Sequence, residues 1–343
     1  ITFYAQEVRE ILASIGARSM DEIIGRADLL TQVSRGSAFL DDLDLNPLLI
    51  TVDGWDKIVY DRSKPRNYVP DTLDAEIIKD GHRFFEEGEK MQLSYAVRNT
   101  LRTIGTRASS HIVKNFGMRN ALQPDHLTVK LTGSCGQSLG AFAAPGLKIE
   151  VSGDANDYVA KGLSGGIIVV RPPMASPLVA SENTIIGNTV LYGATDGYLF
   201  AAGRAGERFA VRNSGAKVVV EGCGSNGCEY MTGGVAVILG RIGANFGAGM
   251  TGGMAYLYDP EGLAEDYMNL ESLVTCGLGH SHWEHQLKGL IERHAKETGS
   301  RKAADILQNW EAERANFLQV CPKEMLAHLP FPLTDEPAAM PAE

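Results

Sequence analysis

The sequence has no surplus of positive charge. Its 343 residues include 32 Lys and Arg against 42 Asp and Glu, which gives a net charge of −10 at pH 7. Without a basic stripe to neutralise phosphates, the chain is not expected to bind nucleic acid, and its acidity also disfavours an anionic membrane surface. No apolar run approaches the ~20 residues that cross a bilayer, and the opening residues, ITFYAQEVRE, lack the apolar stretch of a secretory signal. We therefore expect a cytoplasmic protein with no nucleic-acid or membrane partner.

Paired cysteines are missing as well. The five cysteines are odd in number, and without a secretion signal this favours reduced thiols. Cys223 and Cys228 are separated by four residues, which is not the usual zinc spacing, and no second Cys or His pair accompanies them. We expect no structural metal there.

The usual phosphate-binding motifs are absent. The glycine-rich segments 162–166 and 247–253 look superficially like phosphate loops. However, strand-like runs follow them where a dinucleotide fold needs a helix, and the sequence has no Gly-Lys-Ser/Thr. We interpret both segments as structural turns.

The histidines lack the metalloprotease pattern His-Glu-x-x-His. His282 and His285 are spaced to share a helix face and could bind a metal, with His280 close by. Near a helix start, such residues more often cap the helix, pack, or contact a neighbouring domain. We favour these structural roles and assign the three histidines no further one.

One cluster of polar residues has two interpretations. Asp154, Asn156 and Asp157 could do acid–base work or hold Ca²⁺. Asx side chains also close turns by bonding the backbone, which we favour at this place in the chain.

A second polar group, Glu207, Arg208 and Arg212, could form an ion-pair network along one face. Its role would be structural or interfacial. Because no Ser-His-Asp or Cys-His constellation follows from the spacing, we expect no catalytic, cofactor-binding or metal-binding residue in this segment.

Glycine is what the sequence has in plenty: 38 residues, clustered between Gly133 and Gly253. A small-residue turn followed by a β-rich run repeats there, and most starts are 18 to 20 residues apart. Such steps suit the coils of a parallel β-helix, in which strands stack and glycines turn the corners. We therefore predict a mainly β fold, a single-stranded right-handed parallel β-helix with α-helical N- and C-terminal flanks. An antiparallel sandwich or barrel, the alternative, would space its strands about 8–12 residues apart. The repeats start at Ala144, Ser164, Thr195, Ser214, Thr232 and Thr251.

Helices are predicted on both sides of the repeat. Apolar residues at helical spacing indicate helices within 5–15, 71–100, 109–116 and 283–318. The sequence Ser-Met-Asp-Glu from Ser19 has the pattern of a capping box that would start a further short helix.

Several blocks across the repeat are recognisable. They are Gly136-Gln-Ser, Gly153-Asp-Ala-Asn-Asp-Tyr158, Lys161-Gly-Leu-Ser-Gly-Gly166, Gly187-Asn-Thr189, Leu191-Tyr-Gly-Ala-Thr195, Ala205-Gly-Glu-Arg-Phe209, Val211-Arg-Asn-Ser-Gly215, Val219-Val-Glu-Gly222, Gly227-Cys-Glu-Tyr-Met-Thr-Gly-Gly234 and Asn245-Phe-Gly-Ala-Gly-Met-Thr-Gly-Gly253. In this order, from about Leu127 to Asp259, they closely resemble the GXGXG domain of glutamate synthase large (alpha) subunits.

The flanks carry the same resemblance less specifically. Residues 7–12 and 19–26 look like the last helix of that family's FMN barrel and the segment that leaves it. The tail, with Trp310 and residues 322–325, is similar to the bacterial NADPH-dependent type. The resemblance implies three parts: 1–74, the end of the FMN-barrel domain and a connecting arm; 75–265, the GXGXG domain; and 266–343, a helical tail. Since the chain starts at Ile1, we expect that it was cut from something longer, with a processed N-terminus as the alternative.

The resemblance also implies a parent reaction, in which glutamine and 2-oxoglutarate give two glutamates with electrons from NADPH. In that family an N-terminal amidotransferase and an FMN domain with a [3Fe–4S] cluster share the large subunit. A small flavoprotein (beta) subunit holds FAD, [4Fe–4S] clusters and the NADPH site. The repeat domain would then brace the catalytic domains, with the other domains of its own subunit and the small subunit as partners. Its segment alone would be inactive and hold no cofactor.

Two other classes compete with this interpretation. A non-catalytic β-helix module of another redox complex, similar to the one in formylmethanofuran dehydrogenase, uses the same repeat but should lack an FMN-barrel exit helix within 1–30. A hexapeptide-repeat acyltransferase needs a catalytic histidine between coils, and the tract 144–259 contains none.

Overall fold

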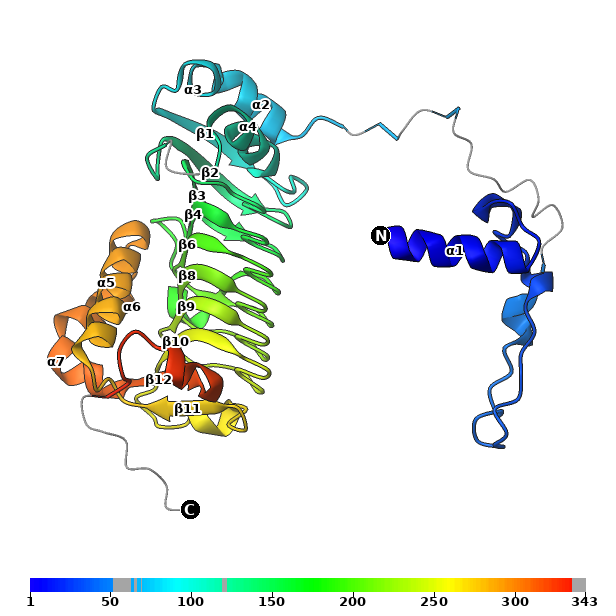
Figure 1. Ribbon diagram of the computed structural model, residues 1–343. Coiled ribbons are helices and arrows are strands. Elements are labelled where there is room, and N and C mark those ends of the chain that lie inside the picture. Colours follow the sequence, from blue (N-terminus) through cyan, green and yellow to red (C-terminus); the bar gives the residue numbers. More distant parts are fainter. Residues whose placement is uncertain (52–62, 65–66, 69, 119–121, 335–343) are drawn as a thin grey trace, which may run out of the picture. The chain divides into compact units, whose positions relative to one another are not determined.

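Figure 1 shows the computed structural model, which describes residues 1–51, 63–64, 67–68, 70–118 and 122–334. The chain divides into two compact units, Ile1–Val69 and Pro70–Glu343. Part of the arm predicted within 1–74, namely residues 52–62, 65–66 and 69, lies outside the described residues.

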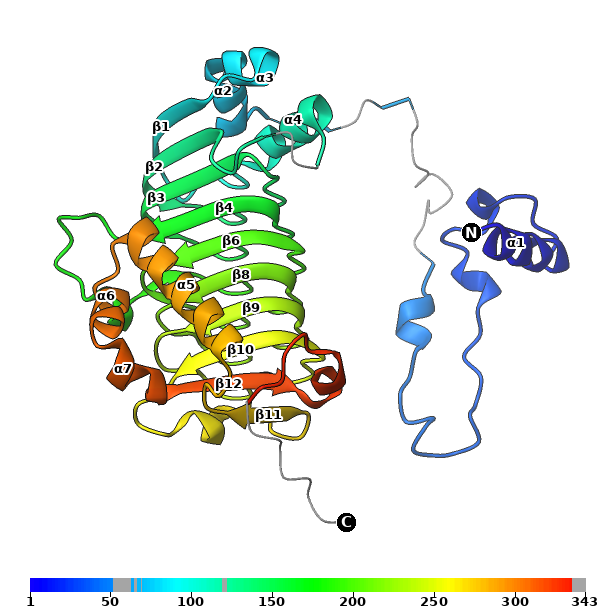
Figure 2. The same cartoon turned by 60° about the vertical axis from the view of Figure 1, so that its left-hand side comes forward.

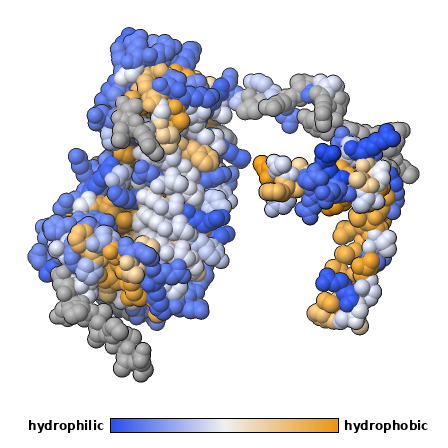
Figure 3. All heavy atoms as spheres, viewed as in Figure 1, coloured by the Kyte–Doolittle hydropathy of each residue, from blue (hydrophilic) through white to orange (hydrophobic). Residues whose placement is uncertain are grey.

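Among its described residues, the first unit holds one α-helix and three short 3₁₀ helices. Helix α1, Thr2–Ser14, confirms the helix expected over 5–15, and η1, Met20–Glu22, η2, Ala27–Leu29, and η3, Asn46–Leu49, follow it. The predicted capping box is not formed, because Ser19 makes no side-chain cap and Glu22 accepts the backbone N–H of Arg18 instead of that of Ser19. Among the described residues of this unit only Leu12 is buried. Apolar side chains, orange in Figure 3, therefore lie along its surface.

The second unit is built on a 12-stranded sheet with the order β1-β2-β3-β4-β6-β8-β9-β10-β12-β11, while β5 and β7 pair off this path. The pairs are parallel except for β12, which is antiparallel to both β10 and β11. The strands are β1 Met91–Val97, β2 Leu127–Cys135, β3 Leu147–Ala155, β4 Ser164–Arg171, β5 Thr184–Ile186, β6 Asp196–Ala201, β7 Arg204–Ala205, β8 Ser214–Val220, β9 Thr232–Ile238, β10 Gly252–Tyr258, β11 Leu273–Cys276 and β12 Phe317–Pro322.

The predicted repeat is confirmed as a stack of parallel strands. Each copy supplies one long strand, and equivalent residues pair across the sheet. One column of partners is buried on the inner side of the sheet and joins the larger hydrophobic core. The alternate column points to the opposite face and joins a second core. The inner column is Ile149, Ile168, Leu199, Val218, Ala236 and Ala255.

Helices cover the second face and the two ends of the sheet. Helix α5, Ser281–Thr298, lies across β4, β6 and β8 (Figure 2), and α6, Arg301–Gln308, and α7, Trp310–Glu313, continue from it. Helices α2, Leu73–Asp80, α3, His82–Glu87, and α4, Thr106–Phe116, pack at the β1 end. Short 3₁₀ helices complete the unit: η5 Ala180–Glu182, η6 Ala264–Tyr267, η7 Arg314–Asn316 and η8 Lys323–His328.

Two of the predicted helical regions contain a strand. Within 71–100, residues Met91–Val97 form β1, because their apolar side chains alternate with polar ones and pair with β2. At the other end, the helical prediction ran to residue 318, whereas β12 begins at Phe317 and adds to the edge of β10.

The predicted fold class, a mainly β, single-stranded right-handed parallel β-helix, is wrong. Of the residues, 30% are helical and 25% are in strands. The strands form one mostly parallel 12-stranded sheet with helices packed on it, so the fold is α/β. The repeat of 18 to 20 residues specified the parallel strands. The segments between the strands are largely turns, and the flanking helices outweigh the strands, which the repeat alone did not reveal.

Candidate interaction face

Six turns of eight residues lead into the strands of the repeat, and they share one backbone conformation. The third, fifth and seventh residue of every turn lies in the left-handed region, with φ between +53° and +72°. Most of these positions do not hold glycine; Tyr158, Leu191 and Arg212 are examples. For an L-residue this conformation costs roughly 1–2 kcal/mol, so the surrounding structure must hold it in place. The turns are 136–143, 156–163, 187–194, 206–213, 224–231 and 243–250.

Backbone hydrogen bonds between successive turns supply this support. At the third position, the Tyr158 N–H donates to the Asn188 carbonyl and the Thr189 N–H to the Glu207 carbonyl, both at 2.8 Å. At the fifth position the direction reverses, and the Ala160 N–H donates back to the Leu139 carbonyl at 2.8 Å. Each of the four inner turns is therefore bonded to the turn before it and the turn after it, which fixes their spacing.

The fourth residue of each turn points inward. Leu139, Val159, Val190, Phe209 and Phe246 are all fully buried in the core of the sheet. The exception, Gly227, leaves room for its neighbours, since a Cβ there would lie 2.8 Å from the Phe246 ring.

The outward side of the turns presents aromatic side chains. Phe142 is 53% exposed and Tyr230 is 55% exposed. Each ring lies against a glycine of the next turn: a Cβ on Gly162 would be 2.4 Å from the Phe142 ring, and one on Gly249 would be 2.5 Å from the Tyr230 ring. The prediction of turns holds for 162–163 and 247–251, whereas residues 164–166 and 252–253 already belong to β4 and β10.

Cationic side chains lie beside two other aromatic rings of the turns. The Lys161 ammonium lies 5.7 Å from the centre of the Tyr158 ring, and the Arg212 guanidinium lies 5.8 Å from that of Tyr192. Exposed aromatic and arginine side chains are enriched at protein interfaces. We call this set the turn face: Phe142, Tyr158, Lys161, Tyr192, Arg208, Arg212 and Tyr230.

Glu207, Arg208 and Arg212, which the sequence allowed to form an ion-pair network, do not pair with one another. Arg208 pairs instead with Glu229 of the next turn, at 3.1 Å. Arg212 contacts the hydroxyl of Tyr192 at 3.4 Å. Side chains of neighbouring turns lie beside each other, whereas residues adjacent in sequence diverge.

The Asx residues make the expected side-chain bonds to the backbone, but these bonds mostly link neighbouring turns and strands instead of closing a single turn. The Asp157 N–H donates to the Asn156 side chain at 2.7 Å, and Asp157 Oδ1 accepts the Asn188 N–H at 2.8 Å. Asp154 accepts a hydrogen bond from Ser134 on the neighbouring strand at 3.0 Å. These bonds add side-chain links to the backbone ladder of the turns.

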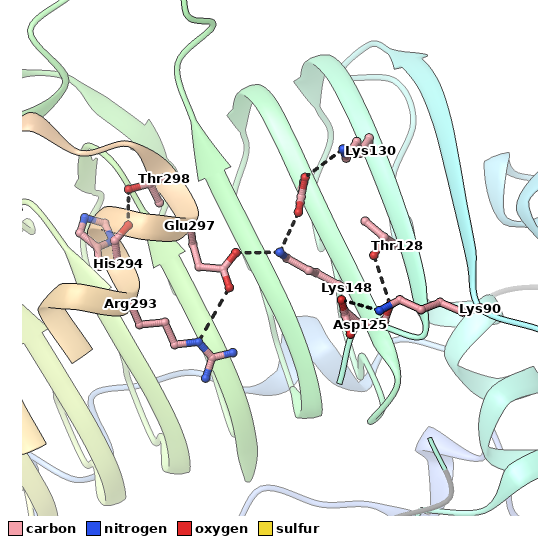
Figure 4. A network of polar contacts seen from close by, with 10 residues as sticks. Lys90, Asp125, Thr128, Lys130, Lys148, Arg293, His294, Glu297 and Thr298 are labelled. Carbon is pink, nitrogen blue, oxygen red and sulfur yellow. Dashed lines mark hydrogen bonds and ion pairs between the residues drawn. The ribbon is translucent and has the colours of Figure 1, made fainter. Parts of the chain in front are cut away.

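A polar network joins the sheet to α5 (Figure 4). Lys148 of β3 lies 2.7 Å from both Glu150 and Glu297, and Glu297 also approaches Arg293 at 3.9 Å. The Arg293 guanidinium in turn lies 3.8 Å from the centre of the Tyr198 ring. Burial lowers the pKa of Lys148, but hydrogen bonds to the two carboxylates more than offset this and raise it.

A second polar group under α5 escaped the sequence analysis. Glu221 follows β8 and accepts a hydrogen bond from the Ser300 hydroxyl, and its Oε1 lies 3.6 Å from His294 Nε2. Glu221 Oε2 and both ring nitrogens of His294 are buried and find no hydrogen-bond partner in the part of the chain that the structure describes. The sequence signal for this buried group is helical spacing, because His294 continues the apolar stripe of Leu287 and Ile291 along α5.

The three histidines at the start of α5 cap and pack. His280 is the N-cap residue, and its ring accepts the His282 N–H at 3.0 Å. The His282 ring stacks on Phe331 at 4.2 Å, and His285 Nδ1 lies 2.6 Å from the Ser281 carbonyl. Within the described ranges, no group of three or more His, Cys, Asp and Glu side chains is arranged to hold a metal ion.

The cysteines are free thiols, and all but Cys276 are buried. Burial raises the pKa of Cys135 and of Cys223 to about 12, and that of Cys321 to about 11. Burial also raises the pKa of Cys228 well above its usual value. Thiols of this kind are poor nucleophiles near neutral pH.

The fold and the turn face together define a domain of stacked, mutually bonded turns with an aromatic and cationic outer surface. The chain belongs to the family described as "GXGXG motif", whose model matches residues 74–323. Among the described residues, no helix is both long and apolar enough to cross a membrane.

Curated relatives carry the name glutamate synthase. The "Glutamate synthase [NADPH] large chain" of Azospirillum brasilense is 63% identical over 342 residues, covering 100% of this chain and 22% of the relative. The protein of the same name in Bacillus subtilis is 42% identical, covering 98% of this chain and 23% of the relative. "Ferredoxin-dependent glutamate synthase 2" of Synechocystis is 44% identical, covering 93% and 21%. The chain thus spans less than a quarter of the length of these relatives.

Proposed function

We propose that this chain is the C-terminal structural segment of a glutamate synthase large chain and braces the catalytic domains of that subunit. The observation that carries the proposal is the 63% identity over the whole chain to a protein more than four times as long. The parent enzyme, an NADPH-linked oxidoreductase, would convert glutamine and 2-oxoglutarate into two glutamates and so assimilate ammonia.

The ladder of turns supports a bracing role. Every turn is hydrogen-bonded to its neighbours, so the spacing of side chains along the turn face cannot change without breaking backbone bonds in a strained conformation. A rigid surface of aromatic and cationic side chains is suited to hold other domains in register, such as the amidotransferase and FMN domains.

The first unit supports the same assignment. Residues 1–74 are proposed as the end of the FMN-barrel domain and its connecting arm, 75–265 as the GXGXG domain and 266–343 as the tail. Phe3, Phe39 and Leu48 are each at least 79% exposed, although such side chains usually pack in a core. The remainder of a barrel would cover them.

The chemistry of the parent is assigned to other segments. FMN and a [3Fe–4S] cluster would be held elsewhere in the large subunit. FAD, [4Fe–4S] clusters and NADPH would be held by the small flavoprotein (beta) subunit. We propose no catalytic, cofactor-binding or metal-binding residue in the present chain.

The purified chain tests this division of labour. We expect that it neither hydrolyses glutamine nor forms glutamate from 2-oxoglutarate and NADPH, and that its absorption spectrum shows no flavin after addition of FMN and desalting. The full-length large chain with its small subunit, assayed in parallel, is the positive control. Turnover or retained flavin in the purified chain would refute the proposal.

A further inference from the structure

One step of the repeat is interrupted by a loop. From Ser164 to Thr195 the repeat takes 31 residues rather than 18 to 20, and the additional length lies between β4 and β5. The loop, residues 172–181, projects beyond the strand ends in green at the left of Figure 2. Three prolines restrict it, and it bonds to itself through the Ser176 N–H, which donates to the Pro173 carbonyl at 2.9 Å.

The loop exposes large apolar side chains. Met174 is 85% exposed, and Leu178 and Val179 are each more than half exposed. A loop that faces only solvent has no need of large apolar side chains. Three of them on a conformationally restricted loop therefore indicate a contact surface.

A cavity of about 330 Å³ separates this loop from the start of α6. Arg171, Arg301 and Lys302 line it, and none of them lies within ion-pair distance of a carboxylate among the described residues. The carboxylate that lines the cavity, Glu221, is engaged by Ser300 and faces His294. In a chain of net charge −10, three cations without a close acidic partner form a local positive site.

Lys302 lies 5.5 Å from the centre of the Tyr258 ring but has no carboxylate within ion-pair distance among the described residues. Burial lowers the pKa of its ammonium group, and the attraction of Glu221 offsets this only in part. An additional carboxylate beside Lys302 would stabilise the charged form. Apolar anchors next to cations without a close carboxylate are complementary to a segment that carries both apolar and acidic side chains.

We propose that the loop 172–181 and this cavity dock an acidic, apolar segment from the remainder of the parent large chain. The occupant is assigned to the same polypeptide because the chain spans only 22% of a relative to which it is 63% identical, so most of that subunit lies outside the present structure. This inference rests on the proposed function and deepens it, since it names a docking surface distinct from the turn face.

Methionine oxidation in the full-length subunit, assembled as the holoenzyme, tests whether the surface is covered. Hydrogen peroxide oxidises exposed methionines, and Met174 serves as its own reference in the urea-unfolded protein. We expect Met174 to oxidise about ten-fold more slowly in the native subunit than in the unfolded one, because the docked segment covers it. Native oxidation within about two-fold of the unfolded rate would overturn the proposal.

Variants then test the chemistry of the contact. Leu178→Asp combined with Arg301→Glu should restore fast oxidation of Met174 in the native holoenzyme. Lys296→Glu is the matched control, since Lys296 is exposed on α5 and does not line the cavity, and it should leave Met174 protected. Equal protection in the double variant and the control would overturn the proposal.

Carbodiimide cross-linking identifies the occupant. Peptide sequencing should join Lys302 to an Asp or Glu of the same polypeptide outside the present residues. A cross-link to a second copy or to the small subunit would overturn the assignment while leaving the bracing role intact, because that role is tested separately on the turn face.

Discussion

The ammonium nitrogen of Lys148 lies 2.7 Å from the carboxylate of Glu297, joining β3 to α5 across 149 positions of sequence. Both side chains are less than a fifth exposed, so water screens their attraction little. Replacing Lys148 by Met should lower the free energy of unfolding by about 2 kcal/mol, because two carboxylates then lose their shared partner. Denaturant titration measures this. The exposed pair Arg241–Glu261 is the matched control, and Arg241→Met should change stability by about 0–1 kcal/mol. Equal losses in the two variants would contradict this account.

The same lysine predicts a dependence on alkaline pH. The pKa of Lys148 is raised above the ordinary value of 10.5, so the folded state binds its proton more tightly than the unfolded state does. The stabilisation is therefore fully present below pH 10.5 and is lost as the pH rises through the raised pKa. We expect the stability difference between the wild type and Lys148→Met to be constant from about pH 7 to 9 and to shrink at higher pH. A difference that grows in alkali would contradict the sign.

Two glycines at the same turn position separate backbone strain from crowding. Gly162 and Gly193 have φ of +63° and +66°, but an added Cβ meets the Phe142 ring at Gly162 and nothing within 4 Å at Gly193. Gly193→Ala should cost about 1 kcal/mol from the left-handed conformation alone, and Gly162→Ala about 1–3 kcal/mol more. Adding Phe142→Ala to Gly162→Ala should remove most of that excess. Equal thermal shifts for the two single variants would show that the aromatic contact does not restrict the turn.

The buried group of Glu221, His294 and Ser300 should respond asymmetrically to substitution. Removing one partner strands the other in the core, so Glu221→Ala should lower the free energy of unfolding by about 3–5 kcal/mol. Glu221→Leu combined with His294→Leu removes both polar groups and should recover most of this loss. Chemical unfolding of the single and double variants measures these free energies. A double variant less stable than Glu221→Ala would mean that the polar pair itself stabilises the fold.

The repeat made the long strands predictable, because a turn and a β-rich run recur from Ala144 to Asp259 at nearly constant spacing. Register and partners between turns were not predictable in the same way. Arg208 pairs with Glu229, 21 positions away, rather than with adjacent Glu207, since neighbouring turns lie closer than neighbouring side chains. The left-handed conformation of Tyr158 also contradicts local preference, and only the ladder of inter-turn bonds explains it.

The glycine content led to the wrong fold class because it indicated only the strand region. It drew attention to the tract between Gly133 and Gly253, whereas α5 and α6 contribute the second core through ordinary apolar spacing. The role of His294 could not be predicted either. Its spacing places it on the apolar face of the helix, but its partner, Glu221, is identified only once the helix is placed on the sheet.

The most direct test of the bracing role is the ratio of glutamate formed to glutamine hydrolysed by the full-length enzyme carrying Phe142→Asp and Tyr230→Asp. Both rings are more than half exposed, and Asp tolerates the left-handed conformation, so the fold should survive. Tyr267→Asp, an exposed tyrosine outside the turn face, is the control. If the turn face holds the catalytic domains in register, the double variant keeps glutamine hydrolysis while the ratio falls well below that of the wild type and the control. A folded double variant with the wild-type ratio would contradict the account.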